Sequence, residues 1–387
     1  MSIINFFDQI SDIFLAIVVF IFGLFIIQRI TNVFKTTKRR AFWLYIWHSF
    51  FCIVYAYVSL STNVDATGYY ISSKYILPDF ELGTNAIIYL TSIFTNGFGL
   101  SFLGVFLVFN IFGAIGLLAV DASLRHATEY KSKLTKFLGL LVVLLPSMSF
   151  WSSAIGKDSI AYMSTGLLLW ACIDFKKNNI LFLFAVACMF FVRPHIGFLI
   201  VIAYALSLIF TKTMSPFKKI FFLIISLFFL NLVMPFILQY IGLSELNYLQ
   251  EYVSKRQAAT SFGGSSIDIS SMPFITQLFT YIFRPLPQEA HNFLSFLSSI
   301  DNLILLIVFT LSLFSVVFSK GKIFSISDSK ENRMFLLIFA LGGIVISSLT
   351  TSNLGIATRQ KWMYVPILLY FMFLFMNVKR PNSSKIK

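Results

Sequence analysis

Long apolar runs separated by charged loops restrict this 387-residue chain to one kind of fold. Hydrophobic residues make up 58% of the chain and charged residues only 12%. A soluble protein of this length could not cover such a surface with polar groups. Runs long enough to cross about 30 Å of hydrocarbon recur along the whole chain, and in lipid each must be helical to satisfy its own backbone hydrogen bonds. The sequence therefore predicts an all-α, polytopic integral membrane protein.

We expect about eleven transmembrane helices in a single integral domain, residues 1–387. The expected spans are 13–30, 41–60, 100–120, 137–150, 159–174, 179–192, 196–210, 220–242, 301–318, 334–350 and 363–378. Two outer loops are long, 61–99 and 243–300. The first contains an amphipathic piece, TNAIIYLTSIFTN, that suits a membrane surface. The second contains a Gly/Ser-rich stretch, SFGGSSIDISS, that predicts a mobile loop.

The basic residues indicate the orientation. Of the 30 lysines and arginines, 22 fall in or beside loops that this arrangement places in the cytoplasm, as the positive-inside rule requires. The N-terminal flank carries two aspartates and no cation, so we expect it outside, and it does not resemble a signal peptide. The C-terminal tail is then cytosolic.

Segment 179–210 is the critical test of this orientation. A single helix through Arg193 would invert every later loop and remove the positive-inside bias. We therefore predict two short helices that meet at Arg193-Pro194, because a proline cannot continue a helix without losing a hydrogen bond.

The motif content excludes several functions. A net charge of +14 is explained by the cytoplasmic loops, so nucleic-acid binding is not expected. There is no Walker loop, GxGxxG, HExxH or GxSxG motif. The three cysteines lie inside apolar runs without CxxC spacing, so neither a metal site nor a cofactor is expected.

A few cations remain on the expected outer side, where the insertion rule depletes them. Arg193, Arg284 and Arg359 lie next to apolar segments, where a guanidinium costs about 2.5–3.5 kcal/mol to insert, so each should have a partner or a wet cavity. The planar fork of arginine matches phosphate oxygens. We predict a pyrophosphate-binding clamp of these three arginines, assisted by Lys157 and Arg256. The alternative is that they reach toward lipid head groups.

Acid–base candidates lie on the same side. Asp65 follows the second span and can act as a general base or as a helix cap. Glu289 and His291 belong to the densest outer polar cluster, RPLPQEAH, and are further catalytic candidates.

Supporting roles are expected for four neighbouring residues. Asp158 can cap the next helix or assist the site. His195 lies two residues after Arg193 in the sequence and can support the same site. Tyr69 and Tyr70 can stack on a sugar ring or serve as interfacial aromatics. Lys361 is expected to reach from a helix end toward the membrane surface.

These features resemble the bacterial O-antigen or capsule repeat-unit polymerases of the Wzy type. The segments FWSSAIGKDSIAY, FVRPHIGFLI, YIFRPLPQEA and SNLGIATRQKW look like those of membrane proteins from polysaccharide clusters. Asp65 is also similar to the first-loop acidic residue of the GT-C glycosyltransferases. Those enzymes often carry two acidic residues there, whereas the next one in this chain, Asp79, lies farther on.

The resemblance implies a multi-pass protein of the bacterial inner membrane that polymerises undecaprenyl-pyrophosphate-linked repeat units at the outer face. Its partners would be that glycan, the bilayer, and a chain-length regulator and flippase of the same pathway. The arginines would stabilise the departing pyrophosphate, and Asp65 or Glu289 would accept the acceptor hydroxyl proton. A GT-C transferase using a polyprenyl-phosphate sugar is the first alternative. A transporter or flippase is the second.

Overall fold

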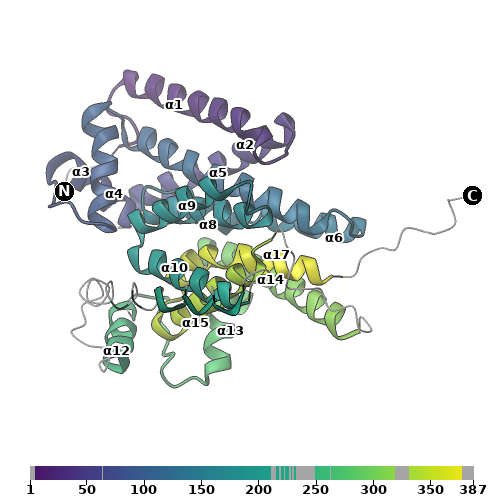
Figure 1. The fold of residues 1–387 in the computed structure, drawn as a ribbon. Coiled ribbons are helices and arrows are strands. Elements are labelled where there is room, and N and C mark those ends of the chain that lie inside the picture. Colours follow the sequence, from purple (N-terminus) through teal and green to yellow (C-terminus); the bar gives the residue numbers. More distant parts are fainter. Residues whose placement is uncertain are drawn as a thin grey trace, which may run out of the picture.

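The fold is all-α, as the sequence predicts. The computed structural model describes residues 5–62, 64–210, 249–261, 263–318 and 331–376, with scattered residues between 215 and 231. Of this described part, 79% is helical and none forms a strand (Figure 1). Six helices are long and apolar enough to cross a membrane. The expected total of eleven spans stays a prediction, because span 220–242 falls largely outside the described residues.

The helices follow most of the predicted spans. The six long segments are α1 (Ile10–Arg29), α2 (Lys38–Ser61), α5 (Phe102–Thr128), α6 with α7 (Lys133–Val143 and Pro146–Trp151), α14 (Phe293–Phe318) and α15 (Arg333–Thr350). Shorter helices occupy other predicted spans: α8 (Lys157–Ile173), α9 (Asn179–Val192), α10 (Pro194–Ile209) and α17 (Val365–Phe375). Helices α5 and α14 are longer than expected.

Helices α5 and α8 form the centre of the bundle. Most of their residues are buried, including Gly116 and Gly166 at their crossing. A Cβ placed on Gly166 would lie 2.6 Å from the Gly116 carbonyl oxygen, so the two backbones can approach closely only without side chains there. In Figure 1, α1 and α2 lie along one side of this centre and α10, α15 and α17 along the other.

The predicted break inside segment 179–210 is confirmed. Helix α9 ends at Val192, and α10 begins at Pro194. Arg193 between them has φ −145° and ψ 74°, outside the helical region. The proline at the first helical position lacks only an N–H that would have no intrahelical partner. The turn leaves the Arg193 side chain at one end of the bundle.

The two long loops contain helices of their own. Loop 61–99 holds α3 (Asp65–Tyr75) and α4 (Thr84–Ser92), and α4 takes up most of the amphipathic piece. Loop 243–300 holds α12 (Leu249–Thr260), α13 (Phe274–Phe283) and the short η4 (Pro287–Glu289). A further short helix, α16 (Leu354–Gln360), leads through η5 (Lys361–Met363) into α17.

Part of the Gly/Ser-rich stretch is anchored, contrary to the expectation of a mobile loop. The amide of Ile267 donates to the Ser352 carbonyl at 2.9 Å, and the amide of Leu354 donates to the Ser265 carbonyl at 2.9 Å. These bonds pair the stretch with the segment that begins α16. Backbone pairing of this kind is not visible in composition, because glycine and serine serve both turns and anchored loops.

Candidate functional site

Five charged residues from distant parts of the chain meet at one end of the bundle. Their contacts link Arg359 to Asp65, Arg359 to Asp158, and Asp158 to Arg193. The Arg359 Nη1 atom donates to Asp65 Oδ2 at 2.8 Å, and its Nε lies 3.1 Å from Asp158 Oδ2. Lys157 lines the same small cavity. We call these residues, Asp65, Lys157, Asp158, Arg193 and Arg359, the charged cluster.

Local structure brings each member of the charged cluster to this end. Lys157 and Asp158 are the first two residues of α8, after Gly156 with φ 153°. A carboxylate in the first turn of a helix is stabilised by the helix dipole. Asp65 begins α3, but its carboxylate binds Arg359 and makes no cap bond, so the helix-cap interpretation is wrong for it.

The charged cluster differs in exposure from its centre to its rim. The Arg193 and Asp158 side chains are largely buried, whereas the Asp65 side chain is 59% exposed and that of Arg359 is 23% exposed. Burial opposes the charge on Arg359, but Asp158 and Asp65 raise the pKa of its guanidinium above the ordinary value. Three cations against two carboxylates leave an excess positive charge. The cavity between them measures about 20 Å³, enough for one water.

Lys157 can change its charge near neutral pH. Its side chain donates to Thr84 Oγ1 at 3.0 Å. Burial, followed by the neighbouring Arg193 guanidinium, lowers the pKa of the Lys157 ammonium to about 8. A lysine with a lowered pKa is cationic below that pH and neutral above it.

If the charged cluster binds an anion, its affinity should fall as pH rises through about 8. Inorganic pyrophosphate binding, measured by calorimetry between about pH 7 and pH 9, should weaken several-fold. Lys157→Arg should remove this pH dependence, because a guanidinium stays charged across the range. An unchanged decline in Lys157→Arg would assign the effect to another group.

The third predicted clamp arginine lies elsewhere. Arg284 pairs with Glu289: its Nε donates to Glu289 Oε1 at 2.8 Å, and the amide of Leu286 donates to Oε2 at 2.8 Å. The hydrogen bond from Arg284 lowers the pKa of the Glu289 carboxyl. Both carboxylate oxygens are thus engaged.

Glu289 and His291 line a separate cavity of about 180 Å³. We call it the polar pocket. It lies between Trp151 of α7, the start of α14 and one face of α16. Helix α16 also carries Arg359. The predicted catalytic residues are therefore divided: Asp65 lies in the charged cluster, and the other two candidates lie in the polar pocket.

The remaining predicted residues have mixed surroundings. Tyr69 is buried against the charged cluster, and burial followed by Asp65 raises the pKa of its hydroxyl to about 12. Tyr70 is buried against the Phe102 ring, 5.1 Å between centroids, so its faces are not open to a sugar.

His195 is partly buried in the first turn of α10. Arg256 is exposed on α12, where its Nε donates to the Tyr252 hydroxyl at 3.1 Å.

Lys361 is the clearest correction. It was expected at the membrane surface, but its side chain is fully buried. Its ammonium donates to the Ile282 carbonyl at 3.0 Å and to the side-chain oxygen of Asn302, whose amide in turn donates to the Pro285 carbonyl. Burial lowers the pKa of this ammonium to about 7. Lys361 therefore ties the end of α16 to the segment that carries Arg284.

His48 is a second residue whose role was missed. It is fully buried in α2, with Nδ1 2.6 Å from Asn110 Oδ1 and Nε2 2.9 Å from Ser152 Oγ. Gly113 makes this contact possible, since a Cβ there would lie 2.1 Å from the Ser152 carbonyl oxygen. The network fixes the start of the segment that leads to Lys157. An apolar run containing one histidine gives no sign of such partners.

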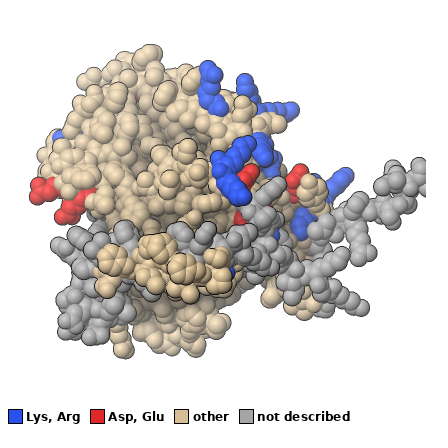
Figure 2. All heavy atoms as spheres, in the orientation of Figure 1, with Lys and Arg blue, Asp and Glu red and all other residues tan. Residues whose placement is uncertain are grey.

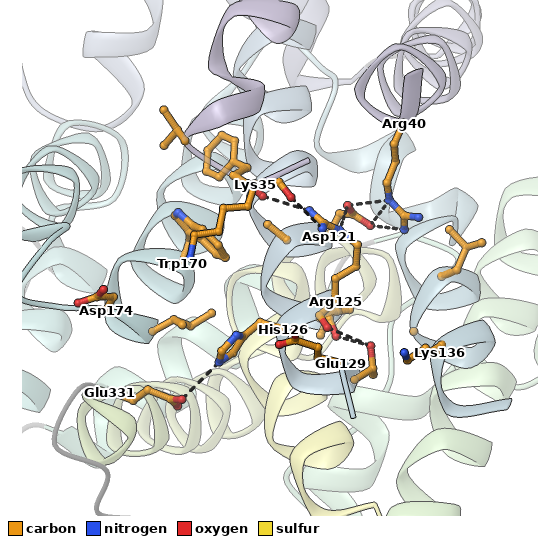
Figure 3. A pocket seen from close by; sticks show the side chains of 18 of the residues that line it. Lys35, Arg40, Asp121, Arg125, His126, Glu129, Lys136, Trp170, Asp174 and Glu331 are labelled. Atoms are coloured by element: carbon orange, nitrogen blue, oxygen red, sulfur yellow. Dashed lines mark hydrogen bonds and ion pairs between the residues drawn. The ribbon is translucent and has the colours of Figure 1, made fainter. Parts of the chain in front are cut away.

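A cavity of about 1540 Å³ lies at the other ends of α2 and α8, among the residues drawn in Figure 3. Several of its charges are engaged with one another. Buried Asp121 accepts hydrogen bonds from Arg40, at 2.9 Å to Nε, and from Arg125 Nε at 2.9 Å. Arg125 also donates to the carbonyls of Phe34 and Lys35. We interpret this network as the joint between the α1–α2 loop and α5.

Asp121→Asn should destabilise this joint. Removing one member of a buried ion pair costs about 3–5 kcal/mol, and we expect the low end because the two arginines are about one-third exposed. Thermal unfolding in detergent should show a clear decrease in Tm. The exposed neighbour Glu129→Gln is the control and should change stability by less than about 0.5 kcal/mol. Equal Tm values for the two variants would contradict the assignment.

Comparisons add no family assignment. No protein-family model, curated protein or solved structure is detectably similar to this chain. Among the described residues no group of three or more His, Cys, Asp or Glu side chains is arranged to hold a metal ion.

Proposed function

We propose that this protein polymerises lipid-linked oligosaccharide repeat units, carried on undecaprenyl pyrophosphate, at the outer face of a bacterial inner membrane. The observation that supports it is the charged cluster, in which Arg193 and Arg359 share Asp158 next to Lys157 and the exposed Asp65. Cations that converge beside apolar helices suit a ligand with a phosphorylated head and a hydrocarbon tail.

The residues would divide the work as follows. Each guanidinium has five N–H donors, so the bonds to Asp65 and Asp158 leave donors for phosphate oxygens. The cavity has room for only one water, so pyrophosphate would bind at its rim, against Arg359 and Lys157. There the cations would stabilise the charge that develops as pyrophosphate leaves. Asp65, held 2.8 Å from Arg359 and exposed, would accept the proton of the attacking sugar hydroxyl.

The distribution of basic residues supports the proposed orientation. Lysine and arginine side chains gather at one end of the molecule in Figure 2. The proposed topology keeps eleven spans, an outer N-terminus and a cytosolic C-terminus. The cavity around Asp121 then faces the cytoplasm, and the charged cluster faces outward.

A GT-C-type transferase is the second candidate, because Asp65 follows the second span and contacts a cation. It would add one sugar from a polyprenyl phosphate. The two candidates differ in product: a polymerase makes a ladder of repeats, and a transferase makes a single addition.

Reconstitution can test the proposal. The purified chain in liposomes should convert undecaprenyl-pyrophosphate-linked repeat units from its host into a ladder on a gel. A single added sugar would favour the GT-C alternative. Movement of the lipid across the bilayer without a new glycosidic bond would favour transport and would overturn the polymerase proposal.

A further inference from the structure

The polar pocket has a different chemistry from the charged cluster. Its lining is mixed. Pro285, Leu294 and Leu354 contribute apolar surface, and the polar residues of the lining include Trp151, His291, Asn292, Ser298 and Thr358. Among the described residues no lysine or arginine lines it, and its carboxylate, Glu289, is paired with Arg284. A mixed surface of this kind suits a neutral ligand that has both hydroxyl groups and apolar faces, as a saccharide does. It offers no cation to a phosphate.

The size of the polar pocket also suits a sugar. Its volume is about 180 Å³, whereas one water needs about 10–15 Å³. Thr358 lines the pocket and is only 2% exposed, whereas His291 is exposed. The Thr358 hydroxyl donates to the Leu354 carbonyl at 2.8 Å, and its oxygen can still accept from a ligand.

Two structural elements connect the polar pocket with the charged cluster. Helix α16 places Thr358 in the polar pocket and the next residue, Arg359, in the charged cluster. Trp151 lines the pocket and packs edge-on against Tyr55, which lines the charged cluster, with 5.4 Å between ring centroids. A saccharide in the pocket would therefore lie next to the proposed pyrophosphate site.

We propose that the polar pocket binds the acceptor saccharide, with Trp151, His291 and Thr358 as its contacts. This assignment rests on the proposed function, because the bound saccharide is an acceptor only if the protein catalyses the polymerisation. Binding of a neutral saccharide does not depend on catalysis and can be measured alone. The pocket would determine which sugar is extended, whereas the charged cluster would bind the common pyrophosphate.

The test uses the lipid-free repeat-unit oligosaccharide released from the host glycan by mild acid. Saturation-transfer NMR with the full chain in nanodiscs should detect binding to the wild type. Thr358→Val and His291→Ala should each weaken it about tenfold, near the upper end of one lost neutral hydrogen bond. Thr358→Ser keeps the hydroxyl and should bind as the wild type does. The exposed Ser271→Ala, outside the pocket, is the control.

The outcomes separate the two proposals. Arg359→Ala should lose polymerisation and keep oligosaccharide binding. If the wild type does not bind the oligosaccharide, or if the Thr358 and His291 variants bind as well as it does, the pocket assignment is overturned. That result leaves the polymerase proposal standing whenever the ladder still forms. Oligosaccharide binding without any ladder would retain the pocket and reject the polymerase.

Discussion

Arg359→Ala is expected to reduce polymer formation by about 10²–10³-fold, the loss seen when one preorganised charge-stabilising donor is removed. Arg359 contacts both carboxylates of the charged cluster, so its removal also leaves Asp65 without its 2.8 Å partner. The rate should fall mainly in kcat, because the leaving pyrophosphate is more charged in the transition state than in the bound substrate.

The measurement is the initial rate of ladder formation in liposomes with a fixed amount of folded protein. Arg359→Lys should recover only part of the activity, since an ammonium keeps the charge without the two-pronged fork. Lys255→Ala is the matched control, because Lys255 is an exposed cation on α12 paired only with Glu251 among the described residues. An Arg359→Ala rate within about twofold of wild type would remove the charged cluster from the mechanism.

Asp65→Asn is expected to lower the rate by about 10²–10⁴-fold, the usual contribution of a general base. Asparagine keeps the shape of the side chain but cannot take up a proton. Binding of the pyrophosphate lipid should be retained or strengthened, since a negative charge leaves a site that binds an anion. This separation between rate and binding distinguishes a base from a residue that only positions Arg359.

Glu289→Gln provides the comparison for Asp65→Asn. Glu289 is already engaged by Arg284 and by the amide of Leu286, so its loss should affect the acceptor side rather than proton removal. We expect a higher KM for the acceptor with a smaller change in kcat. If Glu289→Gln decreased kcat as much as Asp65→Asn does, the general base would be Glu289 in the polar pocket instead of Asp65.

The arrangement of the charged residues could be predicted only in part. The sequence singled out Arg193, Arg284 and Arg359 as a set of expected outer cations, because the positive-inside rule makes such cations exceptional, and two of them share Asp158. It grouped Arg284 with Arg193 and Arg359, but Arg284 pairs five residues along the chain with Glu289. Local pairing of this kind depends on the turn at Pro285–Pro287, which charge statistics do not describe.

The sequence alone determined the all-helical class, most helix positions and the break at Arg193-Pro194. Hydrophobic runs and proline act locally, since a helix in lipid satisfies its hydrogen bonds within one segment. Only the tertiary structure decided that Asp65 meets Arg359, 294 positions away, and that Lys361 is buried beside Asn302. Those contacts depend on which helices pack together and on close approaches such as Gly116 with Gly166. A hydropathy pattern repeats along each helix and carries no information about its neighbours.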